Sequence, residues 1–383
     1  MALQVRHLPG VYIRGTGAYF PSRVVTNDDI LNVILEHGLV RDDNYRFWSR
    51  WRNAAAKLAG KGVRIAMRRK HPTTEALIKS FGYPPSVVEK MGIQRRNWAH
   101  MVGDRLDPQG ENGSDFALKA AERALEDAGL TASEVDALIV TTTTPPRINS
   151  SSSLWLADRL GIQAPAYDLR AGCSGGLYAL LNASVYLQHG CKNVLVVGTE
   201  AYSRFLPPTN KNAIFVTGDG AGAAVVSLGD DPNRGVLGGL VGADARHDRG
   251  YTTLGPMPPT PEAAARGHYI VQGDPREMVE HSFKKYLEII PQVLDLSGVD
   301  IAAIDYHVPH QTSLSVIKSV ARHIHHPMDR TFVNIHEHGN IGAACLLAGM
   351  HEARAAGHLK PGEKLLLSVV GGTMTWGAMV LAQ

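Results

Sequence analysis

The sequence predicts an α/β fold built from two similar halves packed side by side. In each half a helical stretch leads into a buried strand, and a turn of small residues later opens a second helix. Gly129 aligns with Gly298 at the end of the first helical stretch. Asp136 then aligns with Asp305 at the start of the strand. A duplication at this scale indicates two α/β units that share one architecture.

The second helix of each half supports the same alignment. Cys173 in the first half aligns with Asn340 in the second, and from there both helices end seventeen residues later at a glycine. A buried strand follows each glycine. The chain of 383 residues is long enough for two such units. We therefore predict an N-terminal half over residues 1–230 and a C-terminal half over residues 231–383.

Local patterns predict the individual elements. Alternating or continuous apolar runs indicate strands, whereas apolar residues every three or four positions indicate helices. In the first half we expect extended segments over residues 11–28, a helix over 112–129, and buried strands over 135–143, 193–198 and 223–228. In the second half we expect helices over 278–295, 312–325 and 341–356, and strands over 304–309 and 364–370.

A glycine-rich stretch has the spacing of a nucleotide-binding fingerprint but lacks its context. Gly218, Gly220 and Ala223 form the pattern G-x-G-x-x-A. That fingerprint needs a helix directly after it, so that the helix N-terminus faces a pyrophosphate. Residues 223–228 are strand-like instead, and we predict no dinucleotide site.

A basic segment interrupts the first half. Residues 41–80 hold eleven Lys and Arg against three Asp and Glu, although the whole chain has a net charge of only +3. We predict a basic helical insert at residues 41–85 that binds an acidic partner or lies on an anionic membrane surface. The alternative is a solvated helical hairpin whose apolar face packs on the body. The segment has no nucleic-acid reading motif, so we expect no nucleic-acid partner.

Cysteine content and apolar runs indicate the cellular compartment of the protein and whether it spans a membrane. The three cysteines are too few and too unevenly spaced for a disulfide framework or a metal-ligand cluster, and a reducing, cytoplasmic compartment fits them best. No run approaches the roughly 18 apolar residues that a membrane span needs. The histidines at 323, 325 and 326 have no Cys or carboxylate at ligand spacing, so we expect no metal site.

Residues 167–190 contain the strongest catalytic candidate. A short apolar run ends in a small-residue turn that holds Cys173, and a helix then begins. The unpaired N–H groups and positive dipole of a helix N-terminus favour a thiolate, so we expect a lowered pKa for Cys173. We expect Gly172, Gly175 and Gly176 to keep side chains away from an approaching substrate. The alternative is a buried cysteine that acts only as a small apolar residue.

Two further residues complete a candidate catalytic group. If the halves pack about a pseudo-two-fold axis, Cys173 and Asn340 face one cavity, and the strand that ends at His310 closes onto it. A thiolate can take an acyl group, while a neutral His and an Asn amide can donate hydrogen bonds to a thioester carbonyl that becomes an enolate. The set is suited to carbon–carbon bond formation on a thioester.

Several separate motifs resemble the β-ketoacyl-acyl-carrier-protein synthase III family of the thiolase superfamily. They are GTGAYFPSRVVTN near the start, MGIQRRNWA at residues 91–99, AGCSGG, FVTGDGAGAAV, VPHQTS, HEHGNIGAA and GGTMTWGA. The resemblance implies a duplicated thiolase-like fold, which is a five-layer αβαβα sandwich, and a homodimer. It also implies that no cofactor is bound, and that acyl-CoA and acyl-carrier-protein thioesters are the substrates.

The resemblance assigns a role to each candidate residue. Cys173 is acylated, and His310 and Asn340 assist decarboxylation of a malonyl thioester whose carbanion attacks the acyl-enzyme. The backbone N–H groups of Cys173 and Thr373 form the oxyanion hole, although the family usually has glycine where Thr373 stands. The implied function is decarboxylative Claisen condensation in fatty-acid initiation or in a specialised lipid or polyketide pathway.

The substrate-binding positions that the resemblance implies depart from the family pattern. Arg204 keeps its family identity, whereas Ser313 replaces an asparagine and Lys90 replaces an arginine of the coenzyme A site. Each lost contact costs about 1 to 3 kcal/mol, so we expect a weakened grip on coenzyme A and an acyl carrier protein as partner. Asn149 stands where the family places an apolar residue at the dimer interface, which predicts a functionalised, branched or long acyl group.

Other functions could use the same residues. A related acyltransferase would pass the acyl group from Cys173 to an oxygen or nitrogen nucleophile, but that reaction has no need of Asn340. A non-catalytic partner subunit is disfavoured because Cys173, His310 and Asn340 are all present. Peripheral membrane contact through the basic insert is compatible with catalysis.

Overall fold

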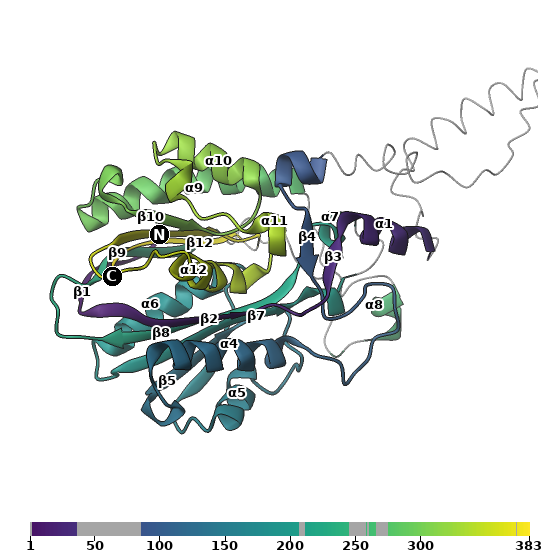
Figure 1. Cartoon of the computed structure of the whole chain (residues 1–383), viewed down its shortest axis with the longest axis horizontal. Coiled ribbons are helices and arrows are strands. Elements are labelled where there is room, and N and C mark those ends of the chain that lie inside the picture. Colours follow the sequence, from purple (N-terminus) through teal and green to yellow (C-terminus); the bar gives the residue numbers. More distant parts are fainter. Residues whose placement is uncertain are drawn as a thin grey trace, which may run out of the picture.

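The computed structural model of the chain has five layers, in which two β-sheets alternate with three layers of helices (Figure 1). It describes residues 2–36, 86–206, 211–244, 258, 260–265, 275–372 and 374–383. The expected αβαβα sandwich is confirmed. The predicted basic insert at residues 41–85 lies outside the described residues.

Each sheet has five strands that come from distant parts of the chain. In spatial order the first sheet contains β2 (Val11–Tyr19), β8 (Asp219–Leu228), β7 (Asn193–Ala201), β5 (Ala137–Thr141) and β6 (Ala166–Leu169). The second contains β1 (Leu3–Pro9), β9 (Gly235–Ala243), β12 (Thr375–Ala382), β11 (Lys364–Val370) and β10 (Tyr306–Pro309).

The two sheets share one pairing pattern, which confirms the internal duplication. In the first sheet β5 is parallel to β7, β7 is antiparallel to β8, and β8 is antiparallel to β2. In the second sheet β10, β11, β12 and β9 repeat these three relationships in the same order. Each sheet then adds one strand of its own, β6 in the first and β1 in the second. Because β1 comes from the N-terminal end, the chain crosses between the sheets, and the division at residue 230 stays a prediction.

Side chains at equivalent positions of the two halves make equivalent contacts. Asp136 accepts two backbone N–H groups at the start of β7, at 2.6 and 2.9 Å. Asp305 accepts one at the start of β11, at 2.7 Å. Each aspartate thus joins two parallel neighbours. Gly129 and Gly298 end their helices with φ of 64° and 66°, a left-handed conformation in which glycine has no Cβ to clash.

Helices form the other three layers. In the middle layer α6 (Gly175–Leu187) and α12 (Cys345–Ala355) lie between the sheets (Figure 1). The outer face of the first sheet is covered by α4 (Gly113–Ala128) and α5 (Ser152–Leu160), and that of the second by α9 (Pro275–Ser297) and α10 (Leu314–His323). Because α6 packs on both sheets, its sequence is apolar on most sides rather than on one face.

The helix α4 shows how local sequence and packing agree. Asn112 and Asp115 form a capping box, in which Asn112 Oδ1 accepts the Ser114 N–H and the Asp115 carboxylate accepts the Asn112 N–H, both at 2.9 Å. The helix approaches β2 closely at Gly17, where a Cβ would lie 2.1 Å from the carbonyl oxygen of Ala120. A glycine on the strand therefore sets the distance between this layer and the sheet.

Smaller elements complete the described chain. β3 (Val24–Thr26), α1 (Asn27–Glu36), β4 (Arg95–Asn97), α7 (Lys211–Ile214) and α11 (Ile335–His338) lie together at one end of the molecule (Figure 1). The remaining short elements are η1 (Ser86–Met91), η2 (Ala132–Glu134), η3 (Tyr202–Arg204), α8 (Pro261–Ala265), η5 (Ile301–Ala303), η6 (Met328–Arg330) and η7 (Gly342–Ala344).

The predicted elements are present with shifted bounds. The helix expected over residues 341–356 begins only at Cys345, because η7 forms a separate turn before it. The strand expected over 135–143 is the shorter β5. β1 and β9 were not predicted, since the glycines of β9 weaken the local strand signal.

Candidate active site

Cys173 lies in a tight turn between β6 and α6. The backbone N–H groups of Ser174 and Gly175 donate to the carbonyl oxygens of Ala171 and Gly172, at 3.2 and 3.0 Å. Gly172 has a φ of 56°, which favours glycine. The turn places the thiol at the N-terminal end of the central helix α6.

The ionisation of Cys173 differs from the prediction. Burial raises the pKa of its thiol to about 11, and the charge of Glu200 adds to the rise. Backbone N–H groups of Gly372 and of Cys173 itself donate to the sulfur and lower the pKa, but they do not outweigh the loss of water. The expected lowering by the helix N-terminus is therefore wrong for the free protein, in which Cys173 is a neutral thiol.

Two glycines beside Cys173 serve protein packing. A Cβ at Gly175 would lie 1.9 Å from Thr141 Oγ1, and one at Gly176 would lie 3.1 Å from the carbonyl oxygen of Ala343. The prediction that they also clear a path for substrate stays a prediction. They let α6 approach β5 on one side and η7 on the other.

His310 directly follows β10, and only 1% of the residue is exposed. Its backbone N–H donates to the carbonyl oxygen of Ser368 at 2.8 Å, which fixes it beside β11. Among the described residues neither ring nitrogen has a hydrogen-bond partner. Burial lowers the pKa of the ring to about 4, so the imidazole is neutral near pH 7. A neutral ring of this kind has one nitrogen to donate and one to accept.

Gln311 holds the backbone next to His310, a role that sequence reasoning missed. Its buried side chain donates through Nε2 to two backbone carbonyls, at 2.9 and 3.2 Å. Its Oε1 accepts the backbone N–H groups of Asn334 and Ile335, at 3.1 and 3.2 Å. These bonds tie the segment after β10 to the segment that leads to Asn340. A glutamine beside a candidate catalytic histidine was the only signal in the sequence.

Asn340 lies in the equivalent loop of the second half. Its backbone N–H donates to Val216 O at 2.8 Å, and its carbonyl oxygen accepts the N–H of Gly218 at 3.1 Å. The side-chain Oδ1 accepts the N–H of Gly342 at 2.9 Å and the thiol of Cys345 at 3.5 Å. Within the described part of the chain, no residue accepts a hydrogen bond from Nδ2, so its two hydrogens are available to a substrate.

The buried sulfur of Cys345 shows that the three candidate segments meet. It accepts the backbone N–H of the residue after Asn340 at 3.2 Å, and also that of the residue after His310. Burial raises the pKa of the Cys345 thiol well above its ordinary value, and a negative charge on Cys173 would raise it further, so the two sulfurs lie near each other. The structure thus gathers the three segments around one side chain.

Glu200 on β7 is a buried carboxylate beside this group, which sequence reasoning also missed. Its Oε1 accepts the N–H groups of Thr143 and Ala343, at 2.9 and 3.3 Å. Its Oε2 accepts the hydroxyls of Thr143 and Thr144, at 2.8 and 2.7 Å. Burial nevertheless raises its pKa to about 7. An acid inside the apolar strand NVLVVGTEA was the available signal.

The glycine-rich turn before β12 is tied to the turn that carries the nucleophile. Ser174 Oγ donates to Thr375 O at 2.8 Å, and Thr375 Oγ1 donates to Ala171 O at 2.6 Å. The Gly372 N–H reaches the nucleophilic sulfur from this turn. Thr373, the second predicted oxyanion-hole residue, lies outside the described residues, and its role stays a prediction.

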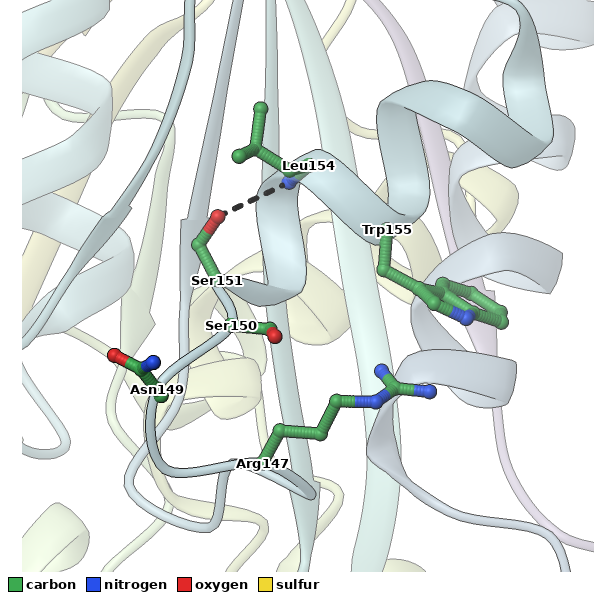
Figure 2. A pocket seen from close by; sticks show the side chains of 6 residues that line it. All are labelled: Arg147, Asn149, Ser150, Ser151, Leu154 and Trp155. Carbon is green, nitrogen blue, oxygen red and sulfur yellow. Dashed lines mark hydrogen bonds between the residues drawn. The ribbon is translucent and has the colours of Figure 1, made fainter.

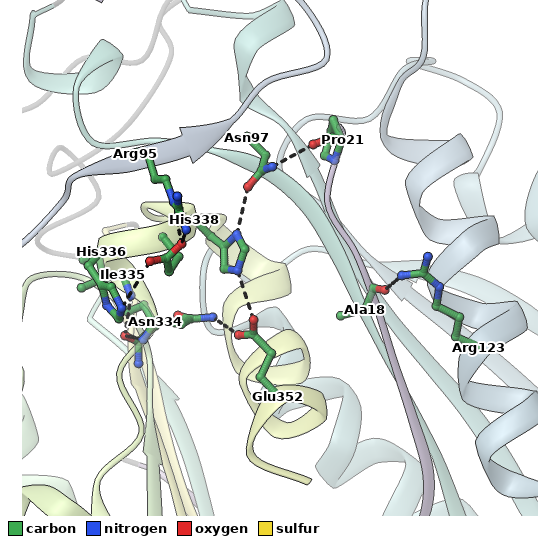
Figure 3. Close-up of polar contacts among 12 residues, drawn as sticks. Ala18, Pro21, Arg95, Asn97, Arg123, Asn334, Ile335, His336, His338 and Glu352 are labelled. Carbon is green, nitrogen blue, oxygen red and sulfur yellow. Dashed lines mark hydrogen bonds and ion pairs between the residues drawn. The ribbon is translucent and has the colours of Figure 1, made fainter. Parts of the chain in front are cut away.

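A polar network braces the chain just before Asn340 (Figure 3). The two ring nitrogens of His338 bond Asn97 at 2.9 Å and Glu352 at 3.1 Å. The ring also stacks on Phe20 with a centroid distance of 3.6 Å. His338 therefore holds the segment before Asn340 against β4 and α12.

The predicted substrate-binding residues have protein partners. Arg204 donates to three backbone carbonyls of residues 107–111, at 2.8 to 3.4 Å, and so holds that loop. The Ser313 hydroxyl donates to Lys90 O at 3.0 Å, while the Lys90 side chain is exposed. Their roles toward a thioester stay predictions.

Asn149 lines a surface cavity of about 530 Å³, together with Arg147, Ser150, Ser151, Leu154 and Trp155 (Figure 2). The guanidinium carbon of Arg147 lies 5.8 Å from the centroid of the Trp155 ring. None of the three candidate catalytic side chains lines this cavity. The predicted contact of Asn149 with an acyl group therefore has no support within a single chain and stays a prediction.

Within the described ranges, no three His, Cys, Asp or Glu side chains are grouped so that they could hold a metal ion. His326 bonds the carbonyl oxygen of Arg330 at 3.1 Å, and His323 packs edge-on against Phe283. In the same ranges, none of the helices combines the length and apolar character that a bilayer span requires.

Two stretches of the chain match family models. Residues 167–245 match the model of 3-oxoacyl-[acyl-carrier-protein (ACP)] synthase III, and residues 294–382 match the model of its C-terminal part. The first stretch contains Cys173, and the second contains His310 and Asn340. The matched regions are therefore those that form the candidate site.

Individual relatives extend the match over most of the chain. The chain is 33% identical over 294 residues to beta-ketoacyl-[acyl-carrier-protein] synthase III from Ruegeria pomeroyi, covering 76% of this chain and 88% of that protein. It is 34% identical over 331 residues to the protein of the same name from Rhodospirillum rubrum, covering 84% and 95%. The crystal structure of 3-oxoacyl-[acyl-carrier-protein] synthase III from Aquifex aeolicus superposes with a TM-score of 0.75 at 26% identity, covering 98% of this chain and 100% of that one. The thiolase-like fold is thereby confirmed, and the chain belongs to the β-ketoacyl-acyl-carrier-protein synthase III family.

Proposed function

We propose that the protein is a condensing acyltransferase, which makes a 3-oxoacyl thioester from an acyl thioester and a malonyl thioester. The observation that carries this proposal is the meeting of the Cys173, His310 and Asn340 segments around one buried sulfur. The His ring and the Asn amide both keep nitrogens without described partners. A nucleophile beside two such donors suits a reaction that passes through an acyl-enzyme and an enolate. Membership of the family supports the same reaction.

In the first step, the sulfur of Cys173 attacks the carbonyl carbon of the acyl thioester. The new sulfur–carbon bond forms, the bond to the carrier's sulfur breaks, and the proton of Cys173 passes to the departing sulfur, which leaves as a free thiol. Because burial keeps Cys173 neutral in the free protein, its proton must be lost as the bond forms. The backbone N–H groups of Cys173 and Thr373 stabilise the oxyanion.

In the second step, a malonyl thioester loses its carboxylate as carbon dioxide, and the electron pair remains on the thioester as an enolate. The neutral His310 ring and Asn340 Nδ2 each donate a hydrogen bond to the enolate oxygen. The enolate carbon then attacks the acyl carbonyl, the bond to Cys173 breaks, and the sulfur takes up a proton from water. Each cycle releases one carbon dioxide and one 3-oxoacyl thioester.

Transfer of the acyl group to an oxygen or nitrogen nucleophile is not favoured. That reaction would not use the Asn340 amide, whose Oδ1 is held by Gly342 and Cys345 so that Nδ2 is free. The relatives that cover most of this chain are synthases by name.

The substrates and partners follow from the same proposal. Acyl-CoA and acyl-carrier-protein thioesters are the donors, no cofactor is bound, and the working unit is a cytoplasmic homodimer. The changes at Lys90 and Ser313 favour the carrier protein, for which residues 41–80 supply positive charge.

Replacing the arginines of residues 41–80 with glutamate should abolish transfer from carrier-bound acyl groups but leave small thioesters reactive. Liposome co-sedimentation tests the competing membrane role.

The proposal is tested by intact-protein mass spectrometry. The protein is incubated with a panel of acyl-CoA and acyl-carrier-protein donors, with and without malonyl carrier protein, in parallel with Cys173→Ala. We expect a donor-specific mass increase that is absent from the variant and is lost again when malonyl carrier protein is added. No increase with any donor would contradict the proposal.

A further inference from the structure

Cys345 is a buried thiol for which the reaction described above has no chemical use. It is the first residue of α12 and is only 2% exposed. Its sulfur faces two backbone donors, the N–H of Ile341 at 3.2 Å and the N–H of Gln311. It also lies 3.5 Å from Asn340 Oδ1. Three polar contacts on one small side chain exceed what packing alone requires.

The directions of these bonds follow from the chemistry of a thiol. A thiol carries one hydrogen, and it cannot point that hydrogen at the Ile341 and Gln311 N–H groups, because both are donors. The carbonyl oxygen of the Asn340 side chain is the acceptor within reach. Cys345 therefore donates to Asn340 and accepts from the two backbone groups.

This arrangement determines which end of the Asn340 amide faces the site. Oδ1 receives two donors, the Gly342 N–H at 2.9 Å and the Cys345 thiol. If the amide were turned over, Nδ2 would face both donors and make neither bond. The observed orientation therefore directs Nδ2 away from Cys345 and leaves it free to donate.

We propose that Cys345 is a positioning residue for the condensation step. Its thiol orients the Asn340 amide, and its sulfur holds the segment after His310 at a fixed spacing from the segment after Asn340. Acyl transfer to Cys173 needs neither of those side chains, whereas stabilisation of the enolate needs both. This inference rests on the proposed function and assigns Cys345 to its second step.

The experiment compares Cys345→Ala, Cys345→Val and Cys345→Ser, with Cys191→Ala as the matched control at a partly exposed free cysteine. Acylation of Cys173 is followed by mass spectrometry, and malonyl-thioester decarboxylation by release of carbon dioxide. We expect the Ala and Val variants to acylate at close to the wild-type rate but to lose about tenfold or more in decarboxylation. Ser keeps a donor and an acceptor, so it should recover most of the loss.

The outcomes separate a positioning role from a packing role. Val fills the space without hydrogen bonds, so it keeps the test valid if Ala fails to fold. The proposal would be overturned if Cys345→Val decarboxylated at the wild-type rate, or if it lost acylation and decarboxylation equally. It would also be overturned if Cys345→Ser decarboxylated as slowly as Cys345→Val. A crystal structure of Cys345→Val gives an answer that does not depend on activity. We expect the Asn340 amide to be turned or displaced there, and an unchanged amide would contradict the role of Cys345 even if no acyl donor is found.

Discussion

The hydroxyl of Ser174 donates a hydrogen bond to the carbonyl oxygen of Thr375 across 2.8 Å, and so joins the turn that carries Cys173 to the first residue of β12. Thr375 returns a second bond through its Oγ1 to Ala171. Gly372, whose N–H reaches the Cys173 sulfur, lies just before this pair of bonds. The pair therefore sets the distance between the nucleophile and the backbone donors of the glycine-rich turn.

Ser174→Ala should impair acyl transfer more than it impairs folding. Loss of one hydrogen bond should lower the free energy of unfolding by about 1 kcal/mol. A shifted glycine-rich turn should slow acylation of Cys173 by about tenfold, measured by rapid-quench mass spectrometry. Ser184→Ala is the control, because Ser184 Oγ donates to Leu180 O at 2.8 Å within the same helix. Equal acylation rates in the two variants would count against the role of Ser174.

Glu200→Gln should change how stability depends on pH. The pKa of Glu200 is raised to about 7 in the folded protein, so the folded state holds a proton that the unfolded chain releases above about pH 4.5. Stability from this group is present below pH 4.5 and is lost as the pH rises through 7. Glutamine can keep the bonds, since its oxygen accepts the backbone N–H groups and the threonine hydroxyls can turn to accept from its nitrogen.

The measurement for Glu200→Gln is urea unfolding between pH 4.5 and 8. As the pH rises over this range, the free energy of unfolding of the variant should increase by up to about 3 kcal/mol relative to that of the wild type. Glu126→Gln, at an exposed position of α4, should show no such gain. Parallel curves for wild type and Glu200→Gln would mean that the carboxylate ionises freely.

His310 should make the free energy of unfolding depend on pH with the opposite sign to Glu200. Its pKa is lowered to about 4, so between pH 6.5 and 4 the unfolded chain binds a proton that the folded protein excludes. The free energy of unfolding should therefore fall as the pH drops below 6.5. In His310→Gln this fall should be smaller by about 2 kcal/mol between pH 7 and 5. The exposed His189→Gln serves as the control, and an unchanged slope in His310→Gln would refute the neutral buried ring.

Gly175→Ala should damage the fold in a way that a second substitution repairs. Its Cβ would lie 1.9 Å from Thr141 Oγ1, a contact that forces α6 away from β5. We expect a loss of about 3 kcal/mol or more in the free energy of unfolding. Thr141→Ala removes that oxygen, which has no partner among the described residues, and should recover most of the loss in the double variant. Additive losses in a double-mutant cycle of chemical denaturation would rule out this contact.

The sequence predicts those parts of the fold that depend on residues close together in the chain. The capping box at Asn112 and the helix-ending Gly129 and Gly298 act within a few residues, so their positions could be found directly. The alignment of Asp136 with Asp305 also indicated the duplication, because each aspartate closes the same pair of strand ends. Strand β1 escaped prediction because it is a short, mostly exposed strand at the edge of its sheet, and its sequence LQVRHLP mixes polar and apolar residues without a sustained apolar run.

The site was predicted less completely than the fold. Sequence spacing and resemblance singled out Cys173, His310 and Asn340, but the ionisation of Cys173 depends on burial by the surrounding layers and came out opposite to the dipole argument. Gln311, Glu200 and Cys345 act by bonding backbone groups of distant segments. Such contacts exist only after the two halves have packed, and no single stretch of sequence contains them.

The pairing of β1 with β9 has a consequence during synthesis. Leu3 pairs with Val241, so the first strand leaves the ribosome long before its partner exists. At a typical rate of chain growth the delay is on the order of ten to fifty seconds. During that time the leading strand of the nascent chain has no sheet to join, and β2 waits almost as long for β8. The speed of translation before residue 235 therefore determines how long the unpaired strand β1 is exposed to aggregation and to chaperones.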